Sequence, residues 1–182
     1  MNTMRRMDCR DLNQEELIRY CLDLSMPKFR GRQIFQWVQQ KAVQNWEEIT
    51  NISANDRQKL QEGLRLEPLQ KIKEQISRDG TRKFLFRCAD GETLECVLMD
   101  YERKKNRDRH TVCVSTQIGC AVGCAFCATG LGGLRRNLSP GEIVGQVLDI
   151  TYAMRQSDPD FQVTNIVFMG MGEPLLNYEN VL

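Results

Sequence analysis

The strand-like run Thr111-Val-Cys-Val-Ser115 leads into Cys120-Ala-Val-Gly-Cys124-Ala-Phe-Cys127, and this stretch organises the interpretation of the whole sequence. It places three thiols, spaced C-x3-C-x2-C, in one short loop that contains glycine. Three thiolates can hold three corners of a [4Fe–4S] cluster, and the fourth iron is then open to a small molecule. The spacing therefore predicts an iron–sulfur site that takes part in a reaction and is not merely structural.

Two other interpretations of the cysteine loop have to be weighed. A structural zinc site normally has four ligands, often as paired C-x2-C knuckles, and the chain has no second knuckle. Cys113 is the nearest additional thiol, but it belongs to the preceding strand. The second alternative is that the three cysteines are ordinary buried residues that are close by coincidence. Gly119 and Gly123 argue against it, because they indicate a tight exposed loop. We favour the iron–sulfur interpretation over both.

The residues after the loop predict a helix and then a second strand. Leu138-Ser-Pro-Gly-Glu142 supplies an N-cap serine, a proline at the first helical position and a glutamate at N3. Asn165-Ile-Val-Phe-Met169 has the composition of a buried strand, and Gly170-Met-Gly-Glu-Pro174 follows at its carboxyl end. This order predicts a parallel sheet, where ligand sites lie beyond the carboxyl ends of strands. Both motifs fall there.

Two further segments precede this region. Residues 1–67 show helical periodicity and predict a helical domain, with Trp37 and Trp46 in its packing and Ser53 capping its third helix. Residues 68–100 contain three strand-like runs. They are joined through two Asp-Gly turns, Asp79-Gly80 and Asp90-Gly91, and predict an antiparallel meander.

Residues 101–110 are polar and largely basic. A solvated linker between domains and a phosphate-facing loop both fit this composition, since clustered Lys and Arg bind nucleic acid without regard to sequence. His110, the only histidine, is assigned no role. Residues 111–182 then form the last predicted segment.

The overall composition restricts the class of protein. The 182 residues are 41% hydrophobic and 27% charged, as in ordinary globular domains. The formal net charge of +1 does not indicate a nucleic-acid partner, so such a claim depends on local patches. The start of the chain resembles no secretory signal, and no apolar run could span a bilayer. With 8 Cys we expect a reduced cytoplasmic protein and no disulfide scaffold.

At this point the sequence resembles a known family. The cysteine motif is similar to that of radical S-adenosylmethionine (SAM) enzymes, and its surroundings resemble the RlmN/Cfr family of RNA adenosine methyltransferases. The match runs almost unbroken from Glu95 to Leu182, and Lys28-Phe-Arg-Gly-Arg-Gln-Ile34 resembles the family's accessory domain. The similar motifs are Cys113-Val-Ser-Thr-Gln-Ile-Gly-Cys120, Cys127-Ala-Thr-Gly130, Arg136-Asn-Leu138, Glu142-Ile-Val-Gly-Gln146 and Phe168-Met-Gly-Met-Gly-Glu-Pro-Leu-Leu-Asn177.

The resemblance implies two cofactors and a set of site residues. It implies that Cys120, Cys124 and Cys127 bind a [4Fe–4S] cluster, and that SAM chelates the open iron and is cleaved to a 5′-deoxyadenosyl radical. Gly172 and Glu173 match the family's SAM-binding turn.

Two catalytic roles rest on the resemblance alone. Cys113 matches the cysteine that resolves a covalent protein–RNA intermediate, for which the family implies a disulfide bond. Glu95 matches the family's proposed acid/base residue. By residue type and position, Cys113 would be a buried strand cysteine and Glu95 a residue on the solvent face of a half-buried sheet.

The resemblance also implies the reaction and its partners. The family methylates C2 of adenosine in 23S rRNA and tRNA through a methyl-cysteine, and we expect an external reductant such as flavodoxin or ferredoxin. The Cfr branch methylates C8 instead, and Gly172-Glu-Pro174 favours the RlmN branch. Arg135 and Arg136 are candidates for RNA contact, although an ordinary solvated pair explains them equally well.

The expected fold class is α/β. It comprises an N-terminal helical accessory domain, a β meander and the first part of a parallel (β/α) radical SAM barrel that is truncated. A complete (β/α)8 barrel needs roughly 200 residues or more, and the methyl-carrying cysteine belongs to the family's C-terminal part. Because the chain stops at Leu182, we expect an N-terminal fragment that is inactive alone. The alternative is a chain that only binds a cluster and RNA.

Overall fold

The computed structural model describes residues 6–101 and 109–182. The chain divides into two compact units, Met1–Pro68 and Leu69–Leu182. Most of the expected basic linker, residues 102–108, lies outside the described residues.

The first unit is helical, as its periodicity predicts. Asn13 opens its first helix with a full capping box, and the Ser53 side chain accepts a hydrogen bond from the Asp56 amide at the start of α3. Gly31 lets α2 approach α1 closely, because a Cβ there would lie 2.5 Å from the backbone of Ile18. The elements are β1 (Met7–Asp8), η1 (Cys9–Asp11), α1 (Gln14–Asp23), α2 (Lys28–Phe35), the π-helical turn η2 (Gln36–Gln40), η3 (Trp46–Glu48), α3 (Ala54–Gly63) and β2 (Leu64–Arg65).

The two tryptophans of the first unit both serve its packing. Trp46 is buried in the core of the unit. The Lys41 ammonium lies 3.4 Å from the centroid of the Trp37 ring, which makes a cation–π contact. The ends of the unit are joined by a parallel pairing of β1 with β2.

The second unit is built on a five-stranded mixed sheet in the order β3-β4-β5-β6-β9. The predicted meander is antiparallel, and it continues through β6 into the parallel β6–β9 pair, so the meander and the barrel strands share one sheet. The elements are β3 (Gln70–Ile76), β4 (Arg82–Arg87), β5 (Thr93–Tyr101), β6 (Arg109–Cys113), β7 (Gln117–Gly119), η4 (Ala128–Gly132), β8 (Leu134–Asn137), α4 (Pro140–Arg155), β9 (Asn165–Val167), η5 (Pro174–Asn177) and α5 (Tyr178–Val181).

The two predicted Asp-Gly turns join the meander. Gly80 and Gly91 have φ of +86° and +91°, a region that glycine enters without steric cost. The Asp79 and Asp90 carboxylates each accept a hydrogen bond from the backbone N–H two residues later. Local turn chemistry thus sets the pairing of the three strands.

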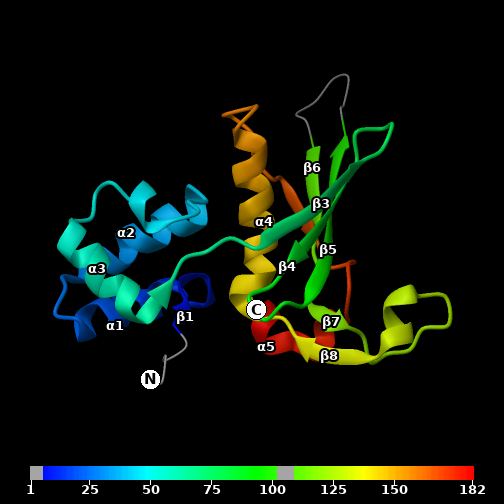
Figure 1. Cartoon of the computed structure of the whole chain (residues 1–182), viewed down its shortest axis with the longest axis horizontal. Helices are drawn as coiled ribbons and strands as arrows, with labels where there is room; N and C mark the ends of the chain where they lie inside the picture. The colour runs from blue at the N-terminus through cyan, green and yellow to red at the C-terminus, as the bar shows by residue number, and fades with distance from the viewer. Residues whose placement is uncertain (1–5, 102–108) are drawn as a thin grey trace. The chain divides into compact units, whose positions relative to one another are not determined.

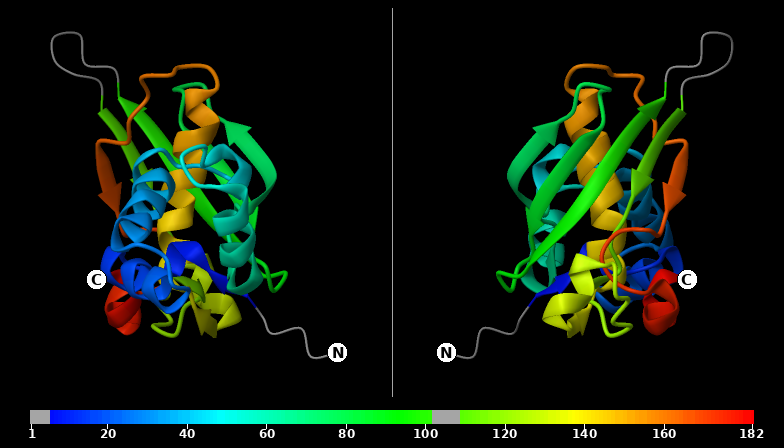
Figure 2. Two further views of the ribbon diagram at one scale, coloured as in Figure 1. Left: turned by 90° about the vertical axis from the view of Figure 1, so that its left-hand side faces the viewer. Right: turned by 90° about the vertical axis from the view of Figure 1, so that its right-hand side faces the viewer.

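One face of the sheet is buried by α4, and both views in Figure 2 place this helix along the sheet. Alternate residues of the strands point to this side, as the period of two requires. The buried cluster includes Phe84 and Phe86, whose rings stack with centroids 5.7 Å apart, and Ile143 and Ile150 of α4. Its other buried members are Cys88, Leu94, Cys96, Leu98, Val112, Val114, Ile118, Leu138 and Phe161.

Helix α4 begins where the sequence predicts. Ser139 accepts a hydrogen bond from the Glu142 amide, the Glu142 carboxylate accepts one from the Ser139 amide, and Pro140 occupies the first turn. The cap fixes the point at which the chain turns from β8 into the helix.

Candidate active site

The carboxyl ends of β6 and β9 meet at the same edge of the sheet. Cys113 is in register with Val167, the Val114 amide donates to the Val167 carbonyl at 2.9 Å, and the Gly170 amide donates to the Val114 carbonyl at 3.1 Å. A Cβ on Gly170 would lie 2.7 Å from that same carbonyl oxygen, so the close approach requires glycine. The cysteine loop and the turn Gly170–Pro174 therefore leave the sheet side by side, as the sequence predicted.

The cysteine loop is closed by a small sheet of its own. Strands β7 and β8 pair on either side of it, and the Cys120 amide donates to the Gly133 carbonyl at 3.1 Å. Gly119 and Gly123 have φ of +75° and +68°, which fits the tight loop predicted from their positions. Figure 1 shows β7 and β8 together at one end of the second unit.

The three loop thiols face solvent to different degrees. Cys124 is exposed, while Cys120 and Cys127 are half-buried. Hydrogen bonds from the backbone and side chain of Thr129 and from the Gly130 backbone lower the pKa of Cys127, which favours the thiolate that binds metals. The donor set therefore fits an iron–sulfur cluster. Within residues 6–101 and 109–182, however, no three Cys, His, Asp or Glu side chains are gathered closely enough to hold a metal ion.

The loop also exposes large apolar side chains beside its cysteines. Phe126, between Cys124 and Cys127, is 93% exposed, and Leu131 is 90% exposed. Across the strand ends, Met169 is 81% exposed. Apolar surface of this kind can shield a cofactor from water, because its burial is favourable.

Glu95 and Cys113 lie on the face of the sheet opposite α4. Glu95 is in register with Leu85 of β4, and Cys113 is in register with Val97, two residues further along β5. The two side chains are thus diagonal neighbours on adjacent strands. Burial raises the pKa of Cys113, and a hydrogen bond with the Met169 backbone opposes that effect.

Glu95 also contacts Lys83, Ser115 and Met171, whose sulfur accepts a hydrogen bond from the Glu95 amide at 3.4 Å. Its carboxylate forms an ion pair with Lys83 at 2.9 Å, and its backbone carbonyl accepts a hydrogen bond from the Ser115 hydroxyl at 2.6 Å. Lys83 and Glu95 are both about half exposed, so the pair contributes little to stability. Its consequence is local, because it places the ammonium group of Lys83 beside the Glu95 carboxylate.

The Gly170–Pro174 turn is tightly determined by its own contacts. Gly172 has φ of +98°, and a Cβ there would lie 2.6 Å from the Cβ of Gln117. Glycine is therefore required at this position by packing inside the protein, beyond any approach of a ligand. The Glu173 carboxylate accepts a hydrogen bond from the Leu175 amide at 3.1 Å and so caps η5.

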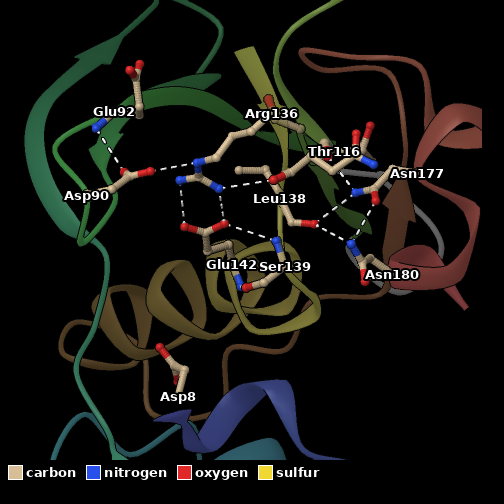
Figure 3. A network of polar contacts seen from close by, with 12 residues as sticks. Asp8, Asp90, Glu92, Thr116, Arg136, Leu138, Ser139, Glu142, Asn177 and Asn180 are labelled. Carbon is tan, nitrogen blue, oxygen red and sulfur yellow. Dashed lines mark hydrogen bonds and ion pairs between the residues drawn. The ribbon is translucent and has the colours of Figure 1, made fainter. Parts of the chain in front are cut away.

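Arg135 and Arg136, the candidates for RNA contact, are both paired with carboxylates. Figure 3 shows the Arg136 guanidinium between Asp90 and Glu142, with distances of 2.6 Å to Asp90 and of 2.6 and 2.9 Å to the two oxygens of Glu142. Arg135 contacts Glu92 at 2.7 Å. Arg136 thus ties β8 to the β4–β5 turn and to α4.

The sequence did not identify three buried polar residues that hold the backbone near the two motifs. They are Ser115, Gln117 and Gln146, all fully buried. The side-chain amide of Gln146 bonds both the backbone N–H and the carbonyl of Ser115, at 2.8 and 2.9 Å. The available signal was their position inside motifs that resemble those of the RlmN/Cfr family. No local periodicity marks them, because their partners are distant in sequence.

Comparison with known proteins bears directly on this geometry. Residues 7–66 match the family model described as "Ribosomal RNA large subunit methyltransferase N-terminal domain". A "Probable dual-specificity RNA methyltransferase RlmN" of Desulfitobacterium hafniense is 85% identical over the whole chain. Over its whole length the chain is similar to RlmN proteins. A second RlmN relative, from Heliobacterium modesticaldum, is 54% identical over 96% of the chain.

The fold of the chain also matches a solved structure. The crystal structure of a radical SAM methyltransferase from Sphaerobacter thermophilus aligns with a TM-score of 0.86 and 43% identity, and the alignment covers 96% of this chain and 49% of that one. The predicted fold class is confirmed. The chain spans about half the length of the curated relatives it matches, 51% for the Desulfitobacterium protein and 45% for the Heliobacterium protein.

Two further observations concern the expectations on environment. The eight cysteines are all free thiols in the structure, so the disulfide bond implied by the resemblance is not formed within it. In the part of the chain that the structure describes, none of the helices combines the length and apolar character needed to cross a bilayer.

Proposed function

We propose that this chain forms part of a radical SAM methyltransferase that methylates C2 of adenosine in 23S rRNA and tRNA. The observation that carries the proposal is the 85% identity, over the full chain, to a protein named as a dual-specificity RNA methyltransferase RlmN. The adjacent carboxyl ends of β6 and β9 support it, because they bring the two cofactor motifs to one edge.

In this proposal Cys120, Cys124 and Cys127 hold the [4Fe–4S] cluster through their thiolates. When bound, the cluster and SAM would supply the radical chemistry that methylation of an unreactive aromatic carbon needs. The exposed loop has to draw its three thiols together on binding. Gly123 can supply the backbone freedom for this, because it has φ of +68° and glycine enters that region without steric cost.

The remaining residues hold the substrate and move protons. Glu173 orients the ammonium group of SAM through its carboxylate. Cys113 serves as the thiol that resolves the protein–RNA intermediate, and the raised pKa keeps it protonated until a base acts on it. Glu95 is the acid/base group on the same face of the sheet, with Lys83 beside it. The disulfide that would follow requires a methyl-carrying cysteine elsewhere in the protein.

The names of the relatives favour the C2 reaction over the Cfr-type C8 reaction. We further propose a cytoplasmic protein that receives electrons from flavodoxin or ferredoxin. The alternative function is that the chain binds a cluster and RNA without methyl transfer. Mass spectrometry of nucleosides from RNA incubated with the protein that includes the methyl-carrying cysteine distinguishes the two, because only the first function produces 2-methyladenosine.

The cluster assignment is tested by anaerobic reconstitution with iron and sulfide. We expect the Cys124→Ala variant to lose the cluster and the Cys113→Ala variant to retain it, as measured by iron and acid-labile sulfide per chain. Tightly bound zinc without acid-labile sulfide would refute the iron–sulfur assignment. Equal loss of iron in both variants would refute the separate role given to Cys113.

A further inference from the structure

Gln117 is a fully buried amide that uses both ends of its side chain. Its carbonyl oxygen accepts a hydrogen bond from the Glu173 amide at 2.9 Å, and its nitrogen donates to the Asn137 side-chain oxygen at 2.8 Å. A buried polar group is costly unless it is paired, so this side chain is strongly held in one orientation.

The first end of this bridge fixes the backbone of the Gly170–Pro174 turn. The Thr116 and Gln117 amides both donate to the Met171 carbonyl, at 2.8 and 3.2 Å, and the Met171 amide donates to the Ser115 hydroxyl at 2.8 Å. A Cβ added to Gly172 would lie 2.6 and 2.8 Å from the Cβ and Cγ of Gln117, so the turn lies against this side chain. The position of the Glu173 backbone therefore follows that of Gln117.

The second end of the bridge reaches the strand that leaves the cysteine loop. Asn137 is the last residue of β8, and it is paired with Gln117 across the small sheet that closes the loop. The Asn177 side chain donates to the carbonyls of Thr116 and Leu138 at 2.8 and 2.9 Å, contacts that Figure 3 shows beside β8. One buried amide thus connects both cofactor motifs.

We propose that Gln117 is a positioning residue for SAM, because it holds the Glu173 backbone at a fixed place relative to the base of the cysteine loop. The inference rests on the proposed function and adds a residue to it. Gln117 touches neither cofactor in this role. It acts through Glu173 on one side and through β8 on the other, so its loss should weaken SAM binding while the three thiols still bind iron.

The test uses the anaerobically reconstituted chain and two substitutions of Gln117. Gln117→Met keeps the length of the side chain but removes both hydrogen bonds, and Gln117→Glu keeps an oxygen that can accept from the Glu173 amide. Calorimetric titration with SAM should show about a tenfold rise in Kd for Gln117→Met, which corresponds to about 1.4 kcal/mol. Gln117→Glu should recover most of that loss, and iron content should be unchanged in both.

Thr151→Val is the matched control for lost stability. The Thr151 hydroxyl is a buried donor to the Val147 carbonyl within α4, away from both motifs, so the variant should lower Tm without changing the Kd for SAM. A tenfold weaker Kd in this control would show that SAM affinity merely follows stability and would overturn the inference. Loss of iron in step with SAM affinity in Gln117→Met would overturn it as well.

The experiment distinguishes failure of the proposed function from failure of the role given to Gln117. If the unsubstituted chain takes up no cluster or binds no SAM, the proposed function is refuted and the inference with it. If that chain binds SAM and Gln117→Met binds it equally well, only the role of Gln117 is refuted.

Discussion

Replacing Arg136 by methionine removes the cation that joins three segments around the base of the cysteine loop. The guanidinium makes close contacts with Asp90 and with both oxygens of Glu142. The Glu142 side chain is only 13% exposed, so its carboxylate would be left buried without its main counter-charge. Removing one partner of a buried ion pair costs about 3–5 kcal/mol. Glu142 keeps its bond from the Ser139 amide, so we expect a loss near the lower end, about 3 kcal/mol.

The neighbouring arginine supplies the control. Arg135→Met removes an ion pair with Glu92 in which the arginine is 66% exposed, and such pairs contribute about 0.2–1 kcal/mol. Urea unfolding followed by far-ultraviolet circular dichroism measures both variants. Both tryptophans lie in the first unit, so their fluorescence should report an unchanged transition for Met1–Pro68.

The Arg136→Met effect should also depend on pH. Burial is the largest single influence and raises the pKa of Asp90 and of Glu142, but the hydrogen bonds and charge of Arg136, together with backbone hydrogen bonds from Glu92 and Ser139, outweigh it and lower both. Groups with a lowered folded pKa stabilise the protein above their unfolded pKa, and that contribution is lost as pH falls through the folded value. The gap between the two proteins should therefore be full at pH 7 and shrink below about pH 4. Equal losses for Arg135→Met and Arg136→Met at pH 7, or a gap that does not change with pH, would refute this reasoning.

Three further predictions concern the edge of the sheet and the start of α4. Ser139→Ala should cost about 1 kcal/mol in urea unfolding because the α4 amides lose their cap, and an unchanged midpoint would contradict the capping box. Gly172→Ala should cost about 2 kcal/mol more than Gly91→Ala, since both have positive φ but only position 172 adds a clash with Gln117; equal losses would contradict the packing. In the cluster-free chain at pH 7, mass spectrometry should find Cys127, whose pKa is lowered, alkylated by iodoacetamide faster than Cys113, whose pKa is raised by burial, and the reverse order would contradict both shifts.

The features that could be predicted from the sequence are those set by neighbouring residues. The Asp90-Gly91 turn, the Ser139 cap and the periodicity of the strands each depend on a few adjacent positions, and the structure has all of them. The parallel pairing of β6 and β9 followed from the order of elements, because parallel strands need a crossover such as α4. Most of the fold could therefore be predicted from rules that involve only neighbouring residues.

The features that could not be predicted depend on contacts between residues far apart in the chain. Nothing adjacent to Arg136 indicates that its partner is Asp90, 46 residues earlier, so it was an equal candidate for RNA contact or solvent. Nothing adjacent to Gln117 indicates its role, because its partners Glu173 and Asn137 are far from it in the sequence. The roles of Cys113 and Glu95 came from resemblance alone, and the register of β5 and β6 places them on one face without testing those roles.

The cysteine loop is held by the small β7–β8 sheet, which is not part of the five-stranded sheet. Its hydrogen bonds close the loop at both ends, and Arg136 and Gln117 anchor those ends to the rest of the unit. Inserting or deleting one or two residues between Cys120 and Gly133 would change the entropy of loop closure, at a cost of a few tenths of a kcal/mol. The register of the flanking strands would stay as it is. The loop can therefore change in length, in evolution or by design, while the strands beneath it keep their pairing.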